Sequence, residues 1–339
     1  MKLLYYPYTL ELKHEFRISS NARKTTPVVL VEIKHNDITG YGEASLPPYL
    51  GESTESVIKF LNKINFEKYT DPLDLENIIN EIDKIEEGNT AAKASIDIAL
   101  HDLYGKIKGE PLYKIWNADK EKTPLTSFTI GIDELDIIRA KVKEAEIYRI
   151  LKVKLGNKND KEIINTIREE TDKPIYVDVN QGWNDKFFAL DMIEWLNGKN
   201  VILIEQPLPK NKIDETAWLT ENSPLPIIAD EAIQRIDDIE KLRNVYSGIN
   251  IKLMKCTGLS EAFKMIKLAG ENNLKILLGC MTETSCAVSA AASLSPFVDW
   301  ADLDGNLLIK NDPFEGVKIE NGRIILNDNP GLGVSKIKK

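Results

Sequence analysis

The segment 175–230 contains the runs IYVD (175–178), VILIE (201–205) and PIIAD (226–230), three short apolar stretches that each end in a carboxylate. A charged stretch whose apolar residues have helical spacing separates each run from the next. Short apolar runs between helical stretches are typical of strands buried on both faces of a parallel sheet. The segment therefore predicts repeated strand–helix units.

The same pattern extends over most of the chain after Pro124. Eight apolar runs are each followed by a charged, amphipathic stretch, and they occupy residues 125–130, 150–155, 175–179, 201–204, 226–229, 248–253, 275–278 and 297–301. Strands that alternate with helices at this spacing pair in parallel, and eight of them close into a barrel. We predict an α/β protein whose main domain, residues 119–312, is a TIM-like (β/α) barrel.

The residues before the barrel follow a different pattern. Residues 1–60 alternate apolar and polar side chains, which predicts antiparallel strands, and residues 53–115 change to helical spacing. Sheet followed by helices predicts an N-terminal α+β capping domain over residues 1–118. The tail, residues 313–339, cannot extend a closed barrel, so we expect it to return to this first domain and complete it.

The composition narrows the class of protein. The chain has 339 residues, 42% apolar and 29% charged, with a net charge of -9. An acidic chain without a basic cluster argues against a nucleic-acid partner. The first fifteen residues carry tyrosines and alternating charges where a secretory signal needs an unbroken apolar stretch, and no later stretch is suited to a membrane span. We expect a cytoplasmic protein with no membrane partner.

Three acids stand where function gathers in such a barrel, at the carboxyl ends of the strands. Asp178, Glu205 and Asp230 end three consecutive strands and would converge on one point as three oxygen ligands. Mg²⁺ prefers oxygen ligands and keeps open positions for water or substrate. A single acid after a strand is unremarkable, but three on adjacent strands predict a site for one Mg²⁺.

Lysines lie on both sides of these acids. Lys152 and Lys154 end the second strand and Lys252 ends the sixth. A lysine acts as a base only when its pKa falls, which a neighbouring cation or a desolvated pocket causes. One interpretation is that each lysine forms a salt bridge with the adjacent acids. Two lysines that face each other across three carboxylates favour the other interpretation, an acid/base pair.

These groups suit one kind of reaction. A proton beside a carboxylate is very weakly acidic, and the enediolate left by its removal carries negative charge that a divalent ion stabilises. A base on each face permits inversion, because one lysine removes the proton and the other returns one from the opposite side. One base alone would suit elimination better. The residues thus predict a 1,1-proton transfer next to a carboxylate.

Motifs along nearly the whole chain resemble the enolase superfamily, in the subgroup named for muconate-lactonizing enzyme. They are Gly40-Tyr-Gly-Glu43, the helix at 94–109, the Lys-x-Lys, Asp178-Val-Asn-Gln-Gly-Trp183, Ile204-Glu-Gln-Pro207, Ala229-Asp-Glu231, Asn250-Ile-Lys-Leu253 and Pro330-Gly-Leu-Gly333. The resemblance implies that Asp178, Glu205 and Asp230 bind the metal. It also implies that Lys154 acts on the L-residue and Lys252 on the D-residue of the substrate.

By the same resemblance, Lys152 supports the substrate carboxylate and tunes Lys154. The sequence departs from the family pattern at Cys256-Thr-Gly258, where a small residue followed by two glycines is usual. This departure bears on the shape of the pocket around Lys252 and removes no catalytic group.

The run Asp302-Leu-Asp304 narrows the subfamily. It resembles the eighth-strand Asp-x-Asp of dipeptide epimerases, whose acids hold the free ammonium group of the dipeptide's first residue. The physics agrees, because a desolvated amine needs an anionic partner. The alternative is that residues 302–306 form a solvated turn. The position at the barrel mouth favours the amine site.

Residues from other segments complete the predicted substrate site. In the segment 19–27, taken as a flexible capping loop, Arg23 resembles the arginine that binds a glutamate side chain in alanyl-glutamate epimerases, and Lys24 is a second candidate. A guanidinium suits a carboxylate best, and a solvent-exposed loop cation is the alternative. Tyr49 is expected to shape the pocket for the first residue, and Thr129 and Met281 are the remaining substrate-binding candidates.

The predicted function is Mg²⁺-dependent epimerisation of a dipeptide at the α-carbon of its C-terminal residue, with the peptidoglycan-derived L-Ala-D/L-Glu as the expected substrate. The alternative activities on the same barrel are N-acylamino acid racemisation, succinylbenzoate synthesis and cycloisomerisation. A barrel that binds a ligand without turnover would be expected to have lost one of the three acids or one of the acid/base lysines, Lys154 and Lys252. All five of these residues are present. The expected partner is a small dipeptide, and the resemblance also allows a homo-oligomer.

Overall fold

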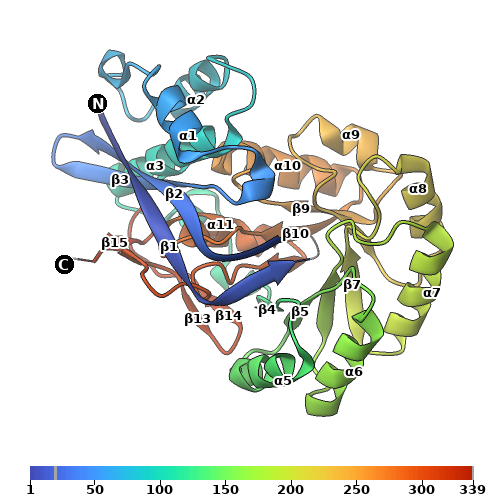
Figure 1. The fold of residues 1–339 in the computed structure, drawn as a ribbon. Coiled ribbons are helices and arrows are strands. Elements are labelled where there is room, and N and C mark those ends of the chain that lie inside the picture. Colours follow the sequence, from blue (N-terminus) through green and yellow to red (C-terminus); the bar gives the residue numbers. More distant parts are fainter. Residues whose placement is uncertain (19–20, 338–339) are drawn as a thin grey trace.

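The computed structural model describes residues 1–18 and 21–337, which form two packed parts (Figure 1). The N-terminal third of the chain makes an antiparallel sheet with helices on it, and this part lies against a (β/α) barrel. The C-terminal residues return toward the N-terminal sheet, so both ends of the chain lie on the same side of the molecule (Figure 1). The predicted fold class is confirmed.

The N-terminal sheet has three antiparallel strands in chain order. Strand β1 (Lys2–Ile18) pairs with β2 (Asn21–His35), which pairs with β3 (Ile38–Ser45). The prediction of a flexible loop at 19–27 is wrong for residues 21–27, because the β1–β2 ladder continues as far as the pair Ile18–Asn21. Residues 19 and 20 lie outside the described part of the chain.

One long helix, α3 (Thr90–Lys108), packs directly on β3. A Cβ atom built on Gly40 would lie 2.1 Å from the carbonyl oxygen of Ala99, and one built on Gly42 would lie 1.9 Å from that of Ser95. Neither position has room for a side chain, because such distances are far inside van der Waals contact. The two glycines therefore let the backbones of strand and helix touch, which fixes β3.

Shorter helices complete this part of the chain. They are η1 (Pro48–Leu50), α1 (Thr54–Leu61), η2 (Phe66–Lys68), α2 (Leu75–Asp83), α4 (Leu112–Ile115) and η3 (Lys120–Lys122). Helix α1 begins with a capping box, in which the Ser53 hydroxyl accepts the Ser56 backbone N–H and the Ser56 hydroxyl accepts that of Ser53.

The barrel consists of eight parallel strands that are neighbours in chain order. They are β4 (Phe128–Ile130), β5 (Leu151–Lys154), β6 (Ile175–Asp178), β7 (Val201–Glu205), β8 (Ile227–Ala229), β9 (Gly248–Ile251), β10 (Lys275–Gly279) and β11 (Trp300–Asp302). A parallel bridge between Thr126 and Ala301 joins the first strand to the last and closes the sheet. The eight predicted strands are thus confirmed, and a helix follows each of the first seven, but within the described residues β11 is followed by turns and not by the predicted helix.

Helices cover the outside of the barrel (Figure 1). They are α5 (Leu135–Glu144), α6 (Asp160–Glu170), α7 (Lys186–Asn197), α8 (Ile213–Asn222), α9 (Asp238–Leu242), α10 (Leu259–Glu271) and α11 (Ser285–Leu294), with the short turns η4 (Ala145–Ile147) and η5 (Ser295–Phe297). The eighth strand begins later than the predicted residue 297, because Pro296 supports the helical turn η5. Asp302 is therefore the last residue of β11.

The C-terminal segment forms two small antiparallel pairs. Strand β12 (Phe314–Glu315) pairs with β15 (Ser335–Lys336), and β13 (Lys318–Glu320) pairs with β14 (Arg323–Ile325). The Lys336 ammonium contacts Glu32 of β2 at 2.8 Å, so the segment does contact the N-terminal sheet. The domain boundaries near residues 118 and 312 stay a prediction. Within the described residues, we find no helix with the length and apolar character needed to span a membrane.

We predict that Gly42→Ala lowers the free energy of unfolding by about 1–3 kcal/mol, the usual cost of overpacking, because the added methyl group collides with the α3 backbone. The matched control is Gly270→Ala in α10, where nothing lies within 4 Å of a built Cβ atom. The control is expected to raise the free energy of unfolding by about 0.5–1 kcal/mol. Urea titrations measure both, and equal stability of the two variants would contradict the close β3–α3 contact.

Candidate active site

A cavity of about 410 Å³ opens at the carboxyl ends of the barrel strands. Ten of the predicted site residues line it, namely Arg23, Tyr49, Thr129, Lys152, Lys154, Asp230, Lys252, Met281, Asp302 and Asp304. Asp178 and Glu205 are fully buried and contact the ammonium group of Lys152. Lys24 is exposed and lies outside this lining, so the structure brings only Arg23, of the two candidate cations, to the cavity.

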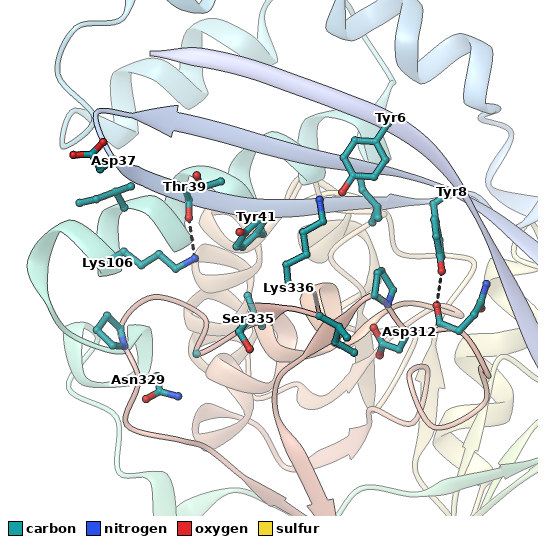
Figure 2. Close-up of a pocket in the computed structure, with 18 residues that line it drawn as sticks. Tyr6, Tyr8, Asp37, Thr39, Tyr41, Lys106, Asp312, Asn329, Ser335 and Lys336 are labelled. Atoms are coloured by element: carbon teal, nitrogen blue, oxygen red, sulfur yellow. Dashed lines mark hydrogen bonds between the residues drawn. The ribbon is translucent and has the colours of Figure 1, made fainter. Parts of the chain in front are cut away.

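A larger cavity of about 1390 Å³ lies between the N-terminal sheet and the C-terminal segment, next to Tyr6 (Figure 2). Its two lysines already have anionic partners, since Lys106 donates to Asp102 at 2.6 Å and Lys336 donates to Glu32 at 2.8 Å. The acid cluster found among the described residues borders the smaller cavity instead. Converging charges, and not size, therefore identify the candidate site.

Asp178, Glu205 and Asp230 come together as predicted. Their nearest oxygens all lie within 4.8 Å of one another, and all three side chains are buried. The parallel register explains this, because Asp178 pairs with Glu205 across β6 and β7, and Asp230 directly follows β8. Burial, and next the charge of Asp178, raise the pKa of Glu205 to about 7. Three crowded oxygen donors of this kind fit a hard divalent cation such as Mg²⁺.

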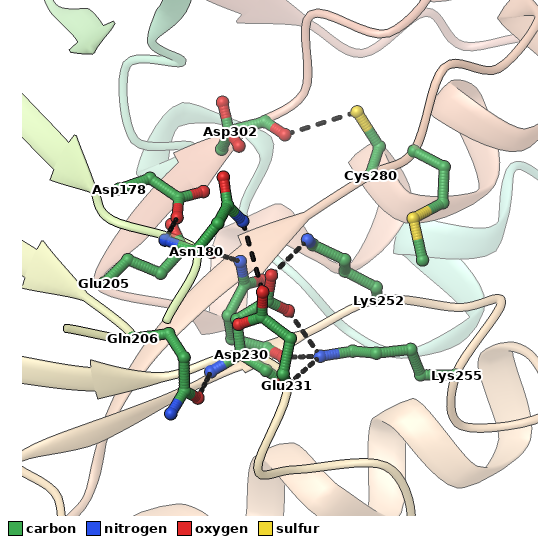
Figure 3. Close-up of polar contacts among 12 residues, drawn as sticks. Asp178, Asn180, Glu205, Gln206, Asp230, Glu231, Lys252, Lys255, Cys280 and Asp302 are labelled. Atoms are coloured by element: carbon green, nitrogen blue, oxygen red, sulfur yellow. Dashed lines mark hydrogen bonds and ion pairs between the residues drawn. The ribbon is translucent and has the colours of Figure 1, made fainter. Parts of the chain in front are cut away.

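Two lysines contact this carboxylate trio from opposite sides. Lys154 Nζ lies 2.5 Å from Asp178 Oδ2. Lys252 Nζ lies 2.7 Å from Asp230 Oδ2 (Figure 3). In the barrel the strands follow one another in the order β5, β6, β7, β8, β9. Lys154 comes from β5 and Lys252 follows β9, so the two lysines flank the strands that carry the trio.

Lys152 lies at the centre of the charged cluster. Its ammonium group is 2.7 Å from Asp302 Oδ2, 2.7 Å from Glu205 Oε2 and 3.1 Å from Asp178 Oδ2. The residue is 1% exposed. This single cation thus joins the carboxylates of three different strands.

The electrostatics differ from the sequence expectation in one respect. We expected neighbouring cations to lower the lysine pKa, yet the pKa of Lys252 is raised well above its usual value. Burial, the largest influence, lowers it, but the negative charges of nearby carboxylates, Asp230 first and then Glu205, outweigh burial. The pKa of Lys152 is raised in the same way, against burial, with Asp302 as the largest favourable charge. In the protein alone, the charges of the carboxylates therefore affect the pKa values of Lys252 and Lys152 more than burial does.

The two aspartates at the end of β11 are buried, at 5% and 4% exposure, which excludes a solvated turn. Asp302 accepts hydrogen bonds from Lys152 at 2.7 Å and from the Ser127 hydroxyl at 2.7 Å. Asp304 accepts the backbone N–H of Thr129 at 2.7 Å. Burial, and next the charge of Asp302, raise the pKa of Asp304 to about 7. This pair would favour a cationic group in the cavity.

Three residues that sequence analysis left without a role also reach the site (Figure 3). The Lys255 ammonium contacts Asp230 Oδ1 at 2.6 Å. Gln206 Oε1 accepts the Asp230 backbone N–H at 3.0 Å and so ties the end of β7 to the end of β8. Glu231 accepts the side-chain amide of Asn180 at 3.2 Å. Gln206 and Glu231 belong to motifs quoted above, and Lys255 lies three residues after Lys252, but spacing alone assigned none of them a partner.

The N-terminal part reaches the site through the residues that follow β10. Arg23 Nη2 donates to Thr282 Oγ1 at 3.0 Å, and the Tyr49 hydroxyl contacts Met281 Sδ at 2.9 Å. The Ser45 hydroxyl donates to the Thr282 carbonyl oxygen at 2.7 Å. The cavity wall around Met281 is therefore held from the N-terminal sheet.

Glu43 makes the most buried of these contacts. It lies on β3, is fully buried, and accepts the Thr284 backbone N–H at 3.0 Å and the Thr284 hydroxyl. Burial, and next the charge of Glu283, raise the pKa of Glu43 to about 8. A pKa of about 8 favours the protonated form of Glu43 in the folded chain at neutral pH.

We predict that Glu43 makes the free energy of unfolding depend on pH. Because its pKa rises from 4.5 to about 8 on folding, the folded chain holds a proton that the unfolded chain releases. The free energy of unfolding is then expected to fall as pH rises through that interval. In Glu43→Gln the fall is expected to be smaller, because glutamine does not release a proton. Denaturant titrations of both chains between about pH 5 and 9, a range that covers most of the interval between the two pKa values, measure the difference. Parallel curves would contradict the prediction.

The chain matches two family models. Residues 7–116 match the N-terminal domain of mandelate racemase / muconate lactonizing enzyme, and residues 137–336 match the enolase C-terminal domain-like model. The chain belongs to the mandelate racemase / muconate lactonizing enzyme family. This membership confirms the resemblance to the enolase superfamily that the sequence motifs carried.

Proteins similar to this chain include two epimerases that act on dipeptides and one racemase. The L-Ala-D/L-Glu epimerase of Bacteroides thetaiotaomicron is 58% identical over 338 residues, which cover 99% of this chain and 88% of that protein. A dipeptide epimerase from Cytophaga hutchinsonii, solved with Mg and the dipeptide D-Ala-L-Val, has a TM-score of 0.91 at 29% identity and covers 99% of this chain and 95% of its own. An N-succinyl Arg/Lys racemase from Bacillus cereus has a TM-score of 0.92 at 28% identity, with the same coverage of 99% and 95%.

Proposed function

We propose that this member of the family is a Mg²⁺-dependent dipeptide epimerase that inverts the α-carbon of the C-terminal residue, with L-Ala-D/L-Glu as its substrate. The observation that carries the proposal is the buried carboxylate trio with a lysine on each side, in one cavity with a second pair of carboxylates. The 58% identity to an L-Ala-D/L-Glu epimerase supports the choice of substrate.

Asp178, Glu205 and Asp230 would hold the metal. Their oxygens are crowded and buried, and burial, followed by the charge of Asp178, raises the pKa of Glu205 to about 7 despite the neighbouring lysines. When bound, Mg²⁺ supplies positive charge that stabilises the substrate carboxylate as the α-proton leaves. The same positive charge offsets the carboxylate charges that raise the pKa of Lys252.

Lys154 and Lys252 would move the proton. They flank the trio, so a substrate α-carbon held above it has one lysine on each face. The lysine that is neutral removes the proton, and the enediolate then takes a proton from the other lysine on the opposite face. In our proposal Lys154 acts on the L-epimer and Lys252 on the D-epimer, while Lys152 orients the substrate carboxylate.

A free amine at the other end of the substrate suits the remaining charges. The site holds five buried carboxylates and four buried lysines, which are Asp178, Glu205, Asp230, Asp302 and Asp304, and Lys152, Lys154, Lys252 and Lys255. Arg23 also lines the cavity, so the charge that favours a cationic group is the local charge of Asp302 and Asp304 and not a net excess over the whole site. The ammonium of a dipeptide would bring positive charge to Asp304, whose raised pKa follows from burial and from Asp302.

The second candidate function is racemisation of an N-acylamino acid, which the similarity to an N-succinyl Arg/Lys racemase supports. An acyl group carries no positive charge. It would leave the pair Asp302 and Asp304 with Lys152 as its cation, and the Lys152 ammonium also contacts Glu205 and Asp178. The aspartate pair therefore favours the dipeptide.

We predict that the chain with Mg²⁺ exchanges the α-proton of the glutamate in L-Ala-D-Glu and inverts it. Removing either base is expected to slow inversion by about 100-fold or more, the lower range of general acid–base catalysis. Proton NMR in D₂O follows the loss of the α-proton signal and the growth of the diastereomer signals, in the wild type, Lys154→Ala and Lys252→Ala.

Lys24→Ala is the control for this experiment, because Lys24 is exposed and lies outside the cavity lining. Inversion at the wild-type rate in Lys154→Ala or Lys252→Ala contradicts the two-base reaction. Exchange of N-succinylamino acids without exchange of any dipeptide would replace the proposal with the second candidate function.

We predict that Arg23 sets the preference for an acidic C-terminal side chain. Arg23 lines the cavity, and a charged hydrogen bond contributes about 1.5–3 kcal/mol, so Arg23→Leu is expected to lower kcat/KM for L-Ala-D-Glu by about 10- to 100-fold. The same variant is expected to act normally on L-Ala-L-Leu. Lys24→Leu is the matched control on the neighbouring residue, and equal losses on both dipeptides would argue against side-chain recognition.

A further inference from the structure

The carboxylates of the trio are each held by a hydrogen-bond donor apart from the flanking lysines. The backbone N–H of Asn180 donates to Asp178 Oδ1 at 3.0 Å. The side-chain amide of Asn250 donates to Glu205 Oε1 at 2.7 Å. For Asp178, the other oxygen is the one that faces Lys154, at 2.5 Å. One oxygen of Asp178 and one of Glu205 thus have a donor that is not a lysine, while Glu205 Oε2, the other oxygen, lies 2.7 Å from Lys152 Nζ.

Lys255 holds the third carboxylate in the same way (Figure 3). Its Nζ donates to Asp230 Oδ1 at 2.6 Å, to the Asp230 carbonyl oxygen at 2.6 Å and to the Asn250 carbonyl oxygen at 3.2 Å. An ammonium group has three N–H donors, and these acceptors use all of them. Asp230 Oδ2, the other oxygen, faces Lys252 at 2.7 Å. Lys255 is buried.

A carboxylate with one oxygen held back offers a single oxygen to a cation. Mg²⁺ is small and takes octahedral sites, whereas Ca²⁺ takes six to eight oxygens and readily binds both oxygens of one carboxylate. We infer that Lys255 and Asn250 are positioning residues that restrict Asp230 and Glu205 to one metal-binding oxygen each, and that this restriction selects Mg²⁺ over Ca²⁺. The inference rests on the proposed function, because it presupposes a metal at the trio.

Comparing two cations of equal charge distinguishes a positioning role of Lys255 from the effect of its positive charge. Removing the Lys255 ammonium removes a positive charge, which strengthens the binding of every divalent cation. Releasing Asp230 Oδ1 supplies a further ligand only to a cation that binds both oxygens of a carboxylate. In the ratio of the Ca²⁺ and Mg²⁺ dissociation constants, the charge effect cancels and the geometric effect remains.

The test measures this ratio in Lys255→Met and Asn250→Leu, two near-isosteric changes that each remove one donor. The full chain is treated with EDTA, dialysed, and titrated in a calorimeter with magnesium chloride and separately with calcium chloride. In both variants the preference for Mg²⁺ over Ca²⁺ is expected to fall by about tenfold or more, the size of effect that residues supporting metal ligands have on affinity.

Lys93→Met is the matched control. Lys93 is also a buried lysine with three acceptors, since it donates to Asp83 Oδ1, the Asp83 carbonyl oxygen and the Glu86 carbonyl oxygen. It lies on α3, in the N-terminal part of the chain. Its removal is expected to lower the stability and leave the ratio of dissociation constants unchanged.

An unchanged ratio in folded Lys255→Met and Asn250→Leu overturns the inference and leaves the proposed function intact. A wild-type chain that binds neither cation overturns both, so the two failures are distinguishable. Circular dichroism and thermal melting establish that each variant folds. If Lys255→Met does not fold, the ratio measured for Asn250→Leu decides.

Discussion

The burial of three carboxylates within 4.8 Å of one another is the constraint on which the rest of the structure depends. In a poorly polarisable interior such repulsion is large, so cations must approach from several directions. Lys152 is the central one of these cations, and its ammonium group contacts Asp178, Glu205 and Asp302. Only a closed parallel barrel brings side chains from so many strands to one end, which is why the fold and the site depend on each other.

The N-terminal part has a second constraint, the contact of two backbones. Gly40 and Gly42 leave no room for a side chain between β3 and α3, so β3 has a fixed position. From that strand Glu43 and Ser45 hold the residues after β10, which form one wall of the cavity. A glycine pair outside the cavity lining thus determines where part of the cavity wall lies.

The strand ends could be read from the sequence because a strand buried on both faces is a continuous apolar run, and the first charge after it marks the barrel mouth. Asp178, Glu205, Asp230 and Lys154 were predicted in this way, and the described structure brings them together. The segment 21–27 could not be read, since the β1–β2 ladder continues through polar residues that resemble a loop. Arg23 and Lys24 were therefore equal candidates until the strand gave them opposite directions, one to the cavity and one to solvent.

The sequence by itself determined the eight barrel strands and the acids and lysines at their ends, because each of these is a local pattern of apolar and charged residues. The burial of Asp302 and Asp304, which excludes a solvated turn, came from the structure. The tertiary structure decided which oxygen of each acid has which partner, where Lys255 and Gln206 act, and that the carboxylates outweigh the neighbouring cations in setting the pKa of Lys252. The physical reason is that hydrogen bonds and charge interactions depend on distances of a few ångströms between residues far apart in the chain, and no local pattern records those distances.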